Sequence, residues 1–438
     1  MNVDVRSSKT DAEKVLAHAF AATRDKLPGK GAVAALREDA FKRFDVRGLP
    51  HRRIEEWKYT DLRALMREAK PLADPAGTKP KDVGIAPVAN RIDATLVTIV
   101  NGRYEPSWGN SDVSDPRITL AELFKFLAEN PEYKLGQTPG SDDTALSLNT
   151  ALMTGGVALR VRKGTSAKKP IHIAHVFFGD AAAAVYPRSL VIVEPDAQLT
   201  VIESYCGPQG LDYQVNSALE LVIGDGAQVT HIKIGCDGDQ ALRVSSLGVT
   251  VGGEANYKDF ALTLGGAVVR NQTFVRFSGE GTVGLIDGAS LLRGKQHVDN
   301  TLVVNHAAGG CFNRDRFKSV LDDESHAIFQ GKIIVEPHAQ KTDAKMMTRA
   351  LILSDEAEAD NKPELEIFAD DVQCGHGATA GPLDKTLKFY LMSRGIPENE
   401  AEALLIRAFI GEVVEDVTHE ALREAIMVAA LEWLGNGP

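Results

Sequence analysis

Hydrophobic and polar residues alternate through the middle of the chain, from about residue 94 to 380. Short apolar segments are separated by turns of Gly, Asp or Glu, each followed by a small residue. The clearest copies are Val191–Thr200, Leu221–Thr230 and Val249–Tyr257. This alternation predicts β-strands, and the turn residues predict tight bends. We expect no long helix in this region apart from one near Leu120–Ala128.

The turns recur along the chain. The small residues that close them are 26 to 32 positions apart, with one interval of 44: Ala197, Ala227, Ala255, Gly281, Ser325 and Ala357. A period in this range indicates a solenoid. Because the repeating unit consists of strands, we predict a flattened parallel β-helix over residues 91–381, with a β-sandwich as the competing fold. The long interval indicates an inserted loop or a degraded repeat.

Both ends of the chain have helical periodicity. Residues 1–90 form a predicted helical region that ends in a linker rich in Pro, Gly and Lys, and residues 382–438 form a second helical region. Asp384 is a predicted helix cap, and Pro397 a predicted helix start. Because a β-helix ends in unpaired strands, we expect the helices to cap these ends, or an open edge to support dimerisation.

Composition limits the possible partners. The chain has 49 Lys and Arg against 60 Asp and Glu, a net charge of −11, which argues against nucleic acid. No apolar run is long enough to span a membrane. The four cysteines lie far apart, and none belongs to a CxxC motif, which argues against a disulfide framework or a self-contained metal cage. With no secretory signal visible, we expect a cytoplasmic protein.

Common catalytic motifs are absent. The chain has no P-loop, no GxGxxG between a strand and a helix, no GxSxG and no HExxH. These absences argue against a P-loop ATPase and against a dinucleotide-binding site.

Cys374 and His376 are the strongest candidates for chemistry. They are two positions apart at the end of an alternating segment, so in a strand they share one face. Thiolate and imidazole suit iron or zinc. Because a complete site needs about four ligands, the others must come from another chain or from earlier turns, where the candidates are His306, Cys311, His326 and His338. The simpler interpretation is a buried cysteine and a hydrogen-bonded histidine.

A second unusual stretch is His51–Leu62, which combines charged residues with Trp57 and Tyr59. We interpret it as a packing anchor with a solvated charged face, in preference to a ligand site.

Several of these segments also resemble one known family. Lys362–Thr379 and Phe389–Ile396 resemble the SufB/SufD family of iron–sulfur cluster assembly proteins, and Phe329–Val335 and Ala339–Ala344 match the same family. Glu55–Thr60 is similar to its N-terminal region. The resemblance implies a right-handed β-helix with helical ends.

Within this family, the chain is most similar to the SufD-like branch. SufB-like members carry a cysteine shortly upstream of the histidine motif, whereas Arg349–Lys362 has none. They also read His-Glu-Ala-Thr where this chain reads His376-Gly377-Ala378-Thr379. The resemblance implies that His376 faces a cysteine of a SufB-like partner at a transient iron–sulfur cluster, with Cys374 nearby.

The resemblance also implies partners. The C-terminal helical region of the family docks a SufC-like ABC-type ATPase, so we expect Tyr390, Arg394 and Phe409 to bind a partner. The chain would act as a scaffold subunit, and as a homodimer when alone. With this role we expect no enzymatic activity, no catalytic residue and no permanently bound cofactor.

Two other functions remain open from the sequence. A β-helix enzyme acting on polysaccharide would need clustered charged groups, which could be Asp322, Asp323, Asp343, Lys345 and Arg349. A homodimeric interaction protein would bind no metal. We expect the acidic stretch 355–371 to be a solvated strand face.

Overall fold

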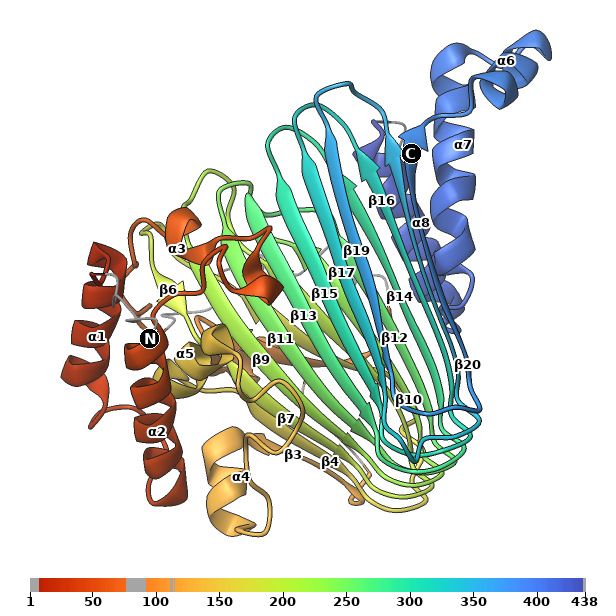
Figure 1. The fold of residues 1–438 in the computed structure, drawn as a ribbon. Helices are drawn as coiled ribbons and strands as arrows, with labels where there is room; N and C mark the ends of the chain where they lie inside the picture. Colours follow the sequence, from red (N-terminus) through yellow and green to blue (C-terminus); the bar gives the residue numbers. More distant parts are fainter. Residues whose placement is uncertain (1–7, 76–91, 111–112, 114, 436–438) are drawn as a thin grey trace, which may run out of the picture.

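The structure is a computed structural model that describes residues 8–75, 92–110, 113 and 115–435. It is a parallel β-solenoid of about 8 turns with helices at both ends of the chain, which confirms the predicted fold class. Most of the predicted linker lies outside the described residues. Two sheets face each other across a hydrophobic interior (Figure 1).

The strands alternate between the two sheets. Sheet I contains, in spatial order, β19 (Glu358–Ile367), β17 (His326–Val335), β15 (His297–His306), β13 (Val268–Phe277), β11 (Leu242–Val251), β9 (Gln214–Ile223), β7 (Arg188–Val193), β4 (Val157–Val161) and β3 (Ile118–Glu122), and the short β6 (Ala184–Val185) pairs with β9. Sheet II contains β2 (Arg103–Tyr104), β1 (Thr95–Val100), β5 (Ile171–Val176), β8 (Gln198–Cys206), β10 (Gln228–Cys236), β12 (Asn256–Thr263), β14 (Val283–Leu292), β16 (Phe312–Leu321), β18 (Asp343–Ile352) and β20 (Gln373–Pro382).

One corner of the solenoid has the same local structure in successive turns. A residue with positive φ is followed by a small side chain that is at most 1% exposed: Asp196-Ala197, Gly226-Ala227, Glu254-Ala255, Gly281-Thr282, Gly310-Cys311 and Lys341-Thr342. The left-handed residue turns the chain sharply, and the small residue fills the space inside the bend. These pairs are the repeat that the sequence indicated.

The irregular interval of 44 residues has a simple origin. Gly281 belongs to this corner, whereas Ser325 belongs to the opposite corner, where its carbonyl accepts a hydrogen bond from the amide of Glu358. The next small residue after Thr282 at the first corner is Cys311, so no loop is inserted. The repeat was missed because a cysteine occupies the position that alanine holds in earlier turns.

Apolar residues form ladders across the stacked turns. Val191, Leu221, Val249 and Val275 are consecutive partners in sheet I, all buried between the two sheets. Burial of apolar surface is the main stabilising contribution in such a core. One turn alone cannot exclude water from its inner face, so each turn depends on its neighbours.

The longer helices lie on the outer faces of the sheets. α1 (Asp11–Thr23), α2 (Ala32–Arg47) and α5 (Thr144–Leu152) share an apolar cluster with sheet I, and α7 (Glu398–Val414) and α8 (Glu420–Trp433) share one with sheet II (Figure 1). α6 (Lys385–Ser393) projects away from the solenoid (Figure 1). At the C-terminal end of the solenoid, the expectation of capping helices was wrong and the alternative of an open edge holds, because β19 and β20 are terminal strands whose residues are partly or fully exposed.

Shorter helical segments complete the fold: η1 (Glu55–Trp57), α3 (Leu62–Leu65), η3 (Pro106–Trp108) and α4 (Leu123–Glu129). α4 confirms the helix expected near residues 120–128, but α5 was not predicted. Every residue of α5 is buried, so it lacks the amphipathic period by which surface helices are recognised. In the described part of the chain, no helix is long and apolar enough to cross a membrane.

Candidate functional site

Cys374 and His376 lie on β20, the last strand of sheet II. Their partners on β18 are Ala344 and Met346, both buried inside the solenoid. Because side chains alternate along a strand, Cys374 and His376 belong to the inner face of the sheet at its open end. The expectation that they share one face is therefore confirmed, and both are at an edge that another molecule can reach.

The two side chains differ in exposure. Cys374 is partly buried and packs against the interior cluster, while His376 is exposed. Burial raises the pKa of the Cys374 thiol above its usual value. The thiol is therefore protonated near neutral pH when the chain is alone, and a metal ion would have to displace that proton to bind the sulfur.

The other three cysteines do not join this site. Cys206 is buried, and burial raises the pKa of Cys236 to about 12. Cys311 is 1% exposed, and its thiol donates to the carbonyl oxygens of Gly279 and Ala308, each at 3.4 Å. Cys311 is therefore a corner residue, and the structure does not place it as a ligand.

The candidate histidines do not converge either. His306 faces the interior with 0% exposure, whereas His326 lies on the outer face of sheet I, where its Nε2 is 2.9 Å from Asp360 Oδ2. The ring of His338 contacts the carbonyl oxygen of Ala307 at a corner. Within the described residues, no group of three or more His, Cys, Asp or Glu could hold a metal ion. Any cluster at Cys374 and His376 would thus need ligands from elsewhere.

A buried polar network in the solenoid interior was missed by the sequence analysis. Glu203 Oε1 lies 3.1 Å from His175 Nε2, and Glu203 Oε2 lies 3.4 Å from His231 Nε2. His231 Nδ1 donates to Asp259 at 2.6 Å. Although burial acts to raise the pKa of Glu203, hydrogen bonds from His175 and His231 and the charge of Lys233 hold it well below its usual value.

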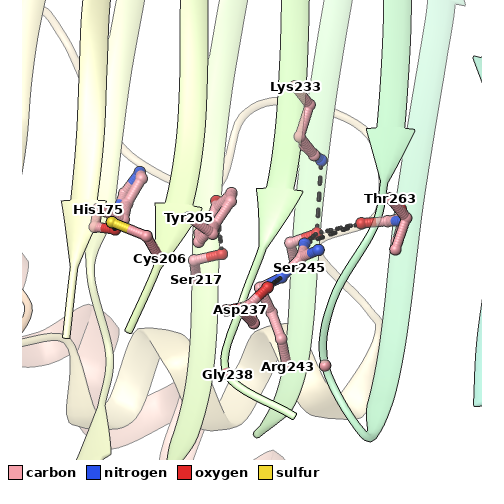
Figure 2. A network of polar contacts seen from close by, with 12 residues as sticks. His175, Tyr205, Cys206, Ser217, Lys233, Asp237, Gly238, Arg243, Ser245 and Thr263 are labelled. Atoms are coloured by element: carbon pink, nitrogen blue, oxygen red, sulfur yellow. Dashed lines mark hydrogen bonds and ion pairs between the residues drawn. The ribbon is translucent and has the colours of Figure 1, made fainter. Parts of the chain in front are cut away.

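The network continues along the axis of the solenoid. Arg243 donates to Asp237 at 2.7 Å and to Asn271 at 2.9 Å, and the Asn271 amide donates to Asn300 at 2.9 Å. Figure 2 shows the part of this network around Arg243. Its sequence signal is polar residues two apart within apolar strands, such as Glu203-x-Tyr205 and His231-x-Lys233.

Aromatic residues separate this network from the open end. Phe329 follows Asn300 in its ladder, and the rings of Phe317 and Phe329 have centroids 4.6 Å apart. Beyond them, Thr348 donates to Asn361 at 2.8 Å in the last turn. The polar interior and the Cys374–His376 edge are thus separate features of the molecule.

Comparisons with known proteins agree with the fold and with these motifs. The model described as "SUF system FeS cluster assembly, SufBD core domain" matches residues 176–409, and that of the "SufBD protein N-terminal region" matches residues 11–173. The chain belongs to the SufBD family. The core model alone covers more than half of its length.

Named relatives of this SufBD family member span most of its length. A Synechocystis protein, described as an iron–sulfur cluster assembly SufBD family protein, is 32% identical over 86% of this chain and 85% of its own. The iron–sulfur cluster assembly protein SufD of Escherichia coli is 28% identical over 89% of this chain and 90% of its own. A SufD of Bacillus subtilis is 30% identical over 64% of each chain.

The predicted partner-binding residues of this SufBD family member differ in environment. Tyr390 on α6 is 53% exposed, and the guanidinium of Arg394 lies 5.2 Å from the centroid of its ring. Phe409 on α7 is only partly exposed, because Lys318 Nζ lies 4.4 Å from its ring centroid and donates to its carbonyl oxygen at 2.6 Å. Two of the three thus lie on the projecting α6 region, and one packs within the chain.

The charged residues considered for a polysaccharide site are separated. Asp343 begins β18 and pairs with Arg314 at 2.8 Å, whereas Asp322 follows the end of β16. A strand of 10 residues spans about 30 Å between these two positions. Arg349 contacts Glu412 on α7 at 3.5 Å. The separation of these described residues gives this alternative no support.

Proposed function

We propose that this SufBD family member is a scaffold subunit for iron–sulfur cluster assembly and no enzyme in its own right. In this role it pairs with a SufB-like subunit and a SufC-like ATPase. His376, with Cys374 nearby, contributes to a transient cluster shared with the SufB-like partner. The observation that carries the proposal is that two metal-ligating side chains lie on the last strand of an open sheet and lack further ligands among the described residues.

The number of ligands supports sharing. Iron–sulfur clusters are held by about four protein ligands, and Cys374 and His376 supply two. The strand that carries them has a free edge, which offers backbone hydrogen bonds to a strand of another chain. A partner that pairs with β20 would bring its own side chains next to His376.

The environment of Cys374 supports a transient role. Its raised pKa keeps the thiol protonated in the isolated chain, so metal binding competes with a proton. A cluster held partly by such a thiol and by an exposed histidine can be released more easily than one in a closed cage. The cluster is thus cargo of the complex.

The C-terminal region supports docking of an ATPase. α6 projects from the solenoid, and its apolar side chains are exposed: Leu387 50%, Phe389 73%, Tyr390 53% and Met392 39%. Exposed apolar groups concentrated on one short helix are typical of interaction surfaces. The chain itself has no P-loop, so ATP hydrolysis would belong to the partner.

The cysteines suit a reducing compartment. Among the described residues, no disulfide joins any of the four, and thiols persist in the cytoplasm. We therefore place the complex there, with no membrane or nucleic acid partner. Alone, the open edge would pair with a second copy of the chain as a homodimer.

The experiment is anaerobic cluster assembly with and without partners. We would purify the chain alone and together with its SufB-like and ATPase neighbours, add iron and sulfide, and record size and visible absorbance. We expect a colourless homodimer alone and a coloured complex with partners, and His376→Ala should abolish the colour. A cluster formed by the chain alone, or unchanged assembly in the variant complex, contradicts the proposal. Thr379→Ala, also exposed on β20, is the matched control.

A further inference from the structure

The N-terminal region contains a concave apolar site of about 440 Å³, between α2, α4 and the segment that follows α4. Its walls are largely hydrophobic: Val33, Leu36, Phe124, Leu127, Tyr133 and Leu135. Small-molecule sites are commonly apolar pockets of this size with a few polar groups. The site is remote in sequence from Cys374 and His376, and the proposed cluster chemistry does not use it.

The polar groups at this pocket are positive or neutral. Lys30 and Lys134 line its rim, together with Gln137, and none of the described residues in its lining carries a carboxylate. Both lysines are exposed, and neither forms an ion pair among the contacts found in the described residues. The pocket thus has an apolar interior and a cationic rim.

A buried guanidinium lies behind one wall. Arg37 is 2% exposed, and its Cζ atom lies 5.3 Å from the ring centroid of the wall residue Phe124. Its Nη atoms donate to the carbonyl oxygens of Pro28 (2.6 Å) and Ala151 (3.2 Å), and its Nε has no hydrogen-bond partner. No carboxylate pairs with it in the described residues. An unpaired buried cation is unfavourable, and an anion bound at this end of the pocket would offset part of that cost.

The other arginine near the pocket is already neutralised. Arg160 lies 5.4 Å from the ring centroid of Tyr133, but its guanidinium is 2.5 Å from Glu194. Among the described residues that line the pocket, the charged ones are Lys30 and Lys134, and Arg37 lies behind one wall; Glu132, next to Tyr133 in the chain, does not line the pocket.

The backbone also shapes this site. Gly29 has φ of +89°, and a Cβ atom built there would lie 2.5 Å from Val33 and 2.9 Å from Phe124. A side chain at Gly29 would both strain the backbone and collide with two walls of the pocket. The glycine therefore lets the loop approach Phe124 and bring the Pro28 carbonyl oxygen to Arg37.

We propose that this pocket binds a single-chain anionic amphiphile, with its hydrocarbon chain against the apolar walls and its headgroup at Lys30 and Lys134. A carboxylate and a phosphate ester share this chemistry. A neutral amphiphile of equal length would contact the apolar walls but would form no ionic contact with Lys30 and Lys134. If a protein segment bound in this pocket, positively charged residues at the rim would not be needed.

The test is calorimetric titration of the full chain with decanoate, decyl phosphate and decanol. We expect saturable binding of one or both anions, and at least about tenfold weaker binding of decanol. The relative affinities of the two anions identify the headgroup. The double variant Lys30→Glu/Lys134→Glu should weaken anion binding by about tenfold or more. Lys163→Glu/Lys295→Glu, which changes two exposed lysines elsewhere, should not.

A steric variant tests the location of binding. Ala128 lines the pocket but is exposed, so Ala128→Trp can fill the space without disturbing the core, which the thermal midpoint of unfolding verifies. We expect this variant to lose binding. No saturable binding of either anion up to about 1 mM, equal affinity for decanoate and decanol, or unchanged binding by Ala128→Trp would each overturn the proposal.

Discussion

The guanidinium of Arg270 lies 3.9 Å from the ring centroid of Trp57, a residue more than 200 positions earlier in the chain. The Trp57 side chain is 2% exposed, and its indole nitrogen donates to Asp143 at 3.1 Å. These contacts fasten the segment 55–60 to the outer face of sheet I. They confirm the interpretation of this segment as a packing anchor.

Trp57→Ala should therefore destabilise the protein strongly. Loss of a buried tryptophan side chain costs about 3–5 kcal/mol, and here the cation–π contact with Arg270 is lost as well. Urea unfolding followed by circular dichroism measures the change, with the exposed neighbour Lys58→Ala as control. Equal midpoints for the two variants would show that the anchor is not required for stability.

Cys374 should be the first thiol to react with iodoacetamide in the isolated chain. The other three cysteines are more enclosed. Because the pKa of Cys374 is raised, its rate of alkylation at neutral pH should be below that of a cysteine peptide. The rate should rise in alkaline solution. Mass spectrometry of digested samples over a pH series measures this. Faster modification of Cys206, Cys236 or Cys311 than of Cys374 would contradict the assigned environments.

Cys311 should tolerate a smaller residue better than a larger one. Alanine fills the equivalent corner position in three earlier turns, so we expect Cys311→Ala to cost below about 1.5 kcal/mol. Cys311→Leu places a larger side chain inside the bend and should cost about 1–3 kcal/mol. Thermal unfolding of both variants provides the comparison, and the reverse order would mean that the corner is not closely packed.

Two buried carboxylates should respond to substitution in opposite directions. The pKa of Glu203 is lowered in the folded protein, so its contribution to stability is present above about pH 4.5 and is lost as the pH falls further. Glu203→Gln leaves His175, His231 and Lys233 without their shared anion, and we expect a loss of about 3–5 kcal/mol at pH 7. The difference from the parent protein should shrink in acid.

Asp315 provides the matched control for Glu203. It is 0% exposed, and burial raises its pKa well above 3.8, so ionisation of this group lowers stability as the pH rises. Asp315→Asn should be neutral or stabilising at pH 8. Denaturant unfolding of both variants between pH 4 and 8 tests the pair, and two variants with the same sign of effect at pH 8 would refute this account.

Phe389→Glu should reduce retention of the ATPase partner while leaving the fold unchanged. Phe389 is 73% exposed on the projecting α6, so its replacement should change stability by within about 0.5 kcal/mol. Co-purification of the complex is the measurement, with Thr386→Glu, which makes the same change of charge at an exposed position of α6, as the control. Equal recovery of the ATPase with both variants would place its docking surface elsewhere.

The sequence predicted the architecture because it contains two repeats. Alternation of apolar and polar residues identifies the strands, and the small residue that recurs after each turn identifies the solenoid. It also placed Cys374 and His376 on one face, since that follows from strand geometry alone. The repeat was not recognised where a different residue fills the corner, as Cys311 does.

Other features depend on contacts between distant segments. The helical period of residues 382–438 predicted helices, but not whether they cover a sheet face or a solenoid end. Likewise, Glu203 and His231 resemble solvent-facing residues in a strand pattern. They face the interior instead, because partners from other turns satisfy their charges. Whether a polar residue has such a partner depends on how the turns stack. The periodicity of the sequence does not show this.

The two open strands, β19 and β20, have a joint consequence. They end opposite sheets at the same turn of the solenoid, so a partner that pairs with one has the other within reach. The second pairing is then an intramolecular step, favoured by a high effective concentration. Recognition at this end would behave as bivalent binding, in which a partner able to pair with both strands outcompetes a chain that can pair with only one.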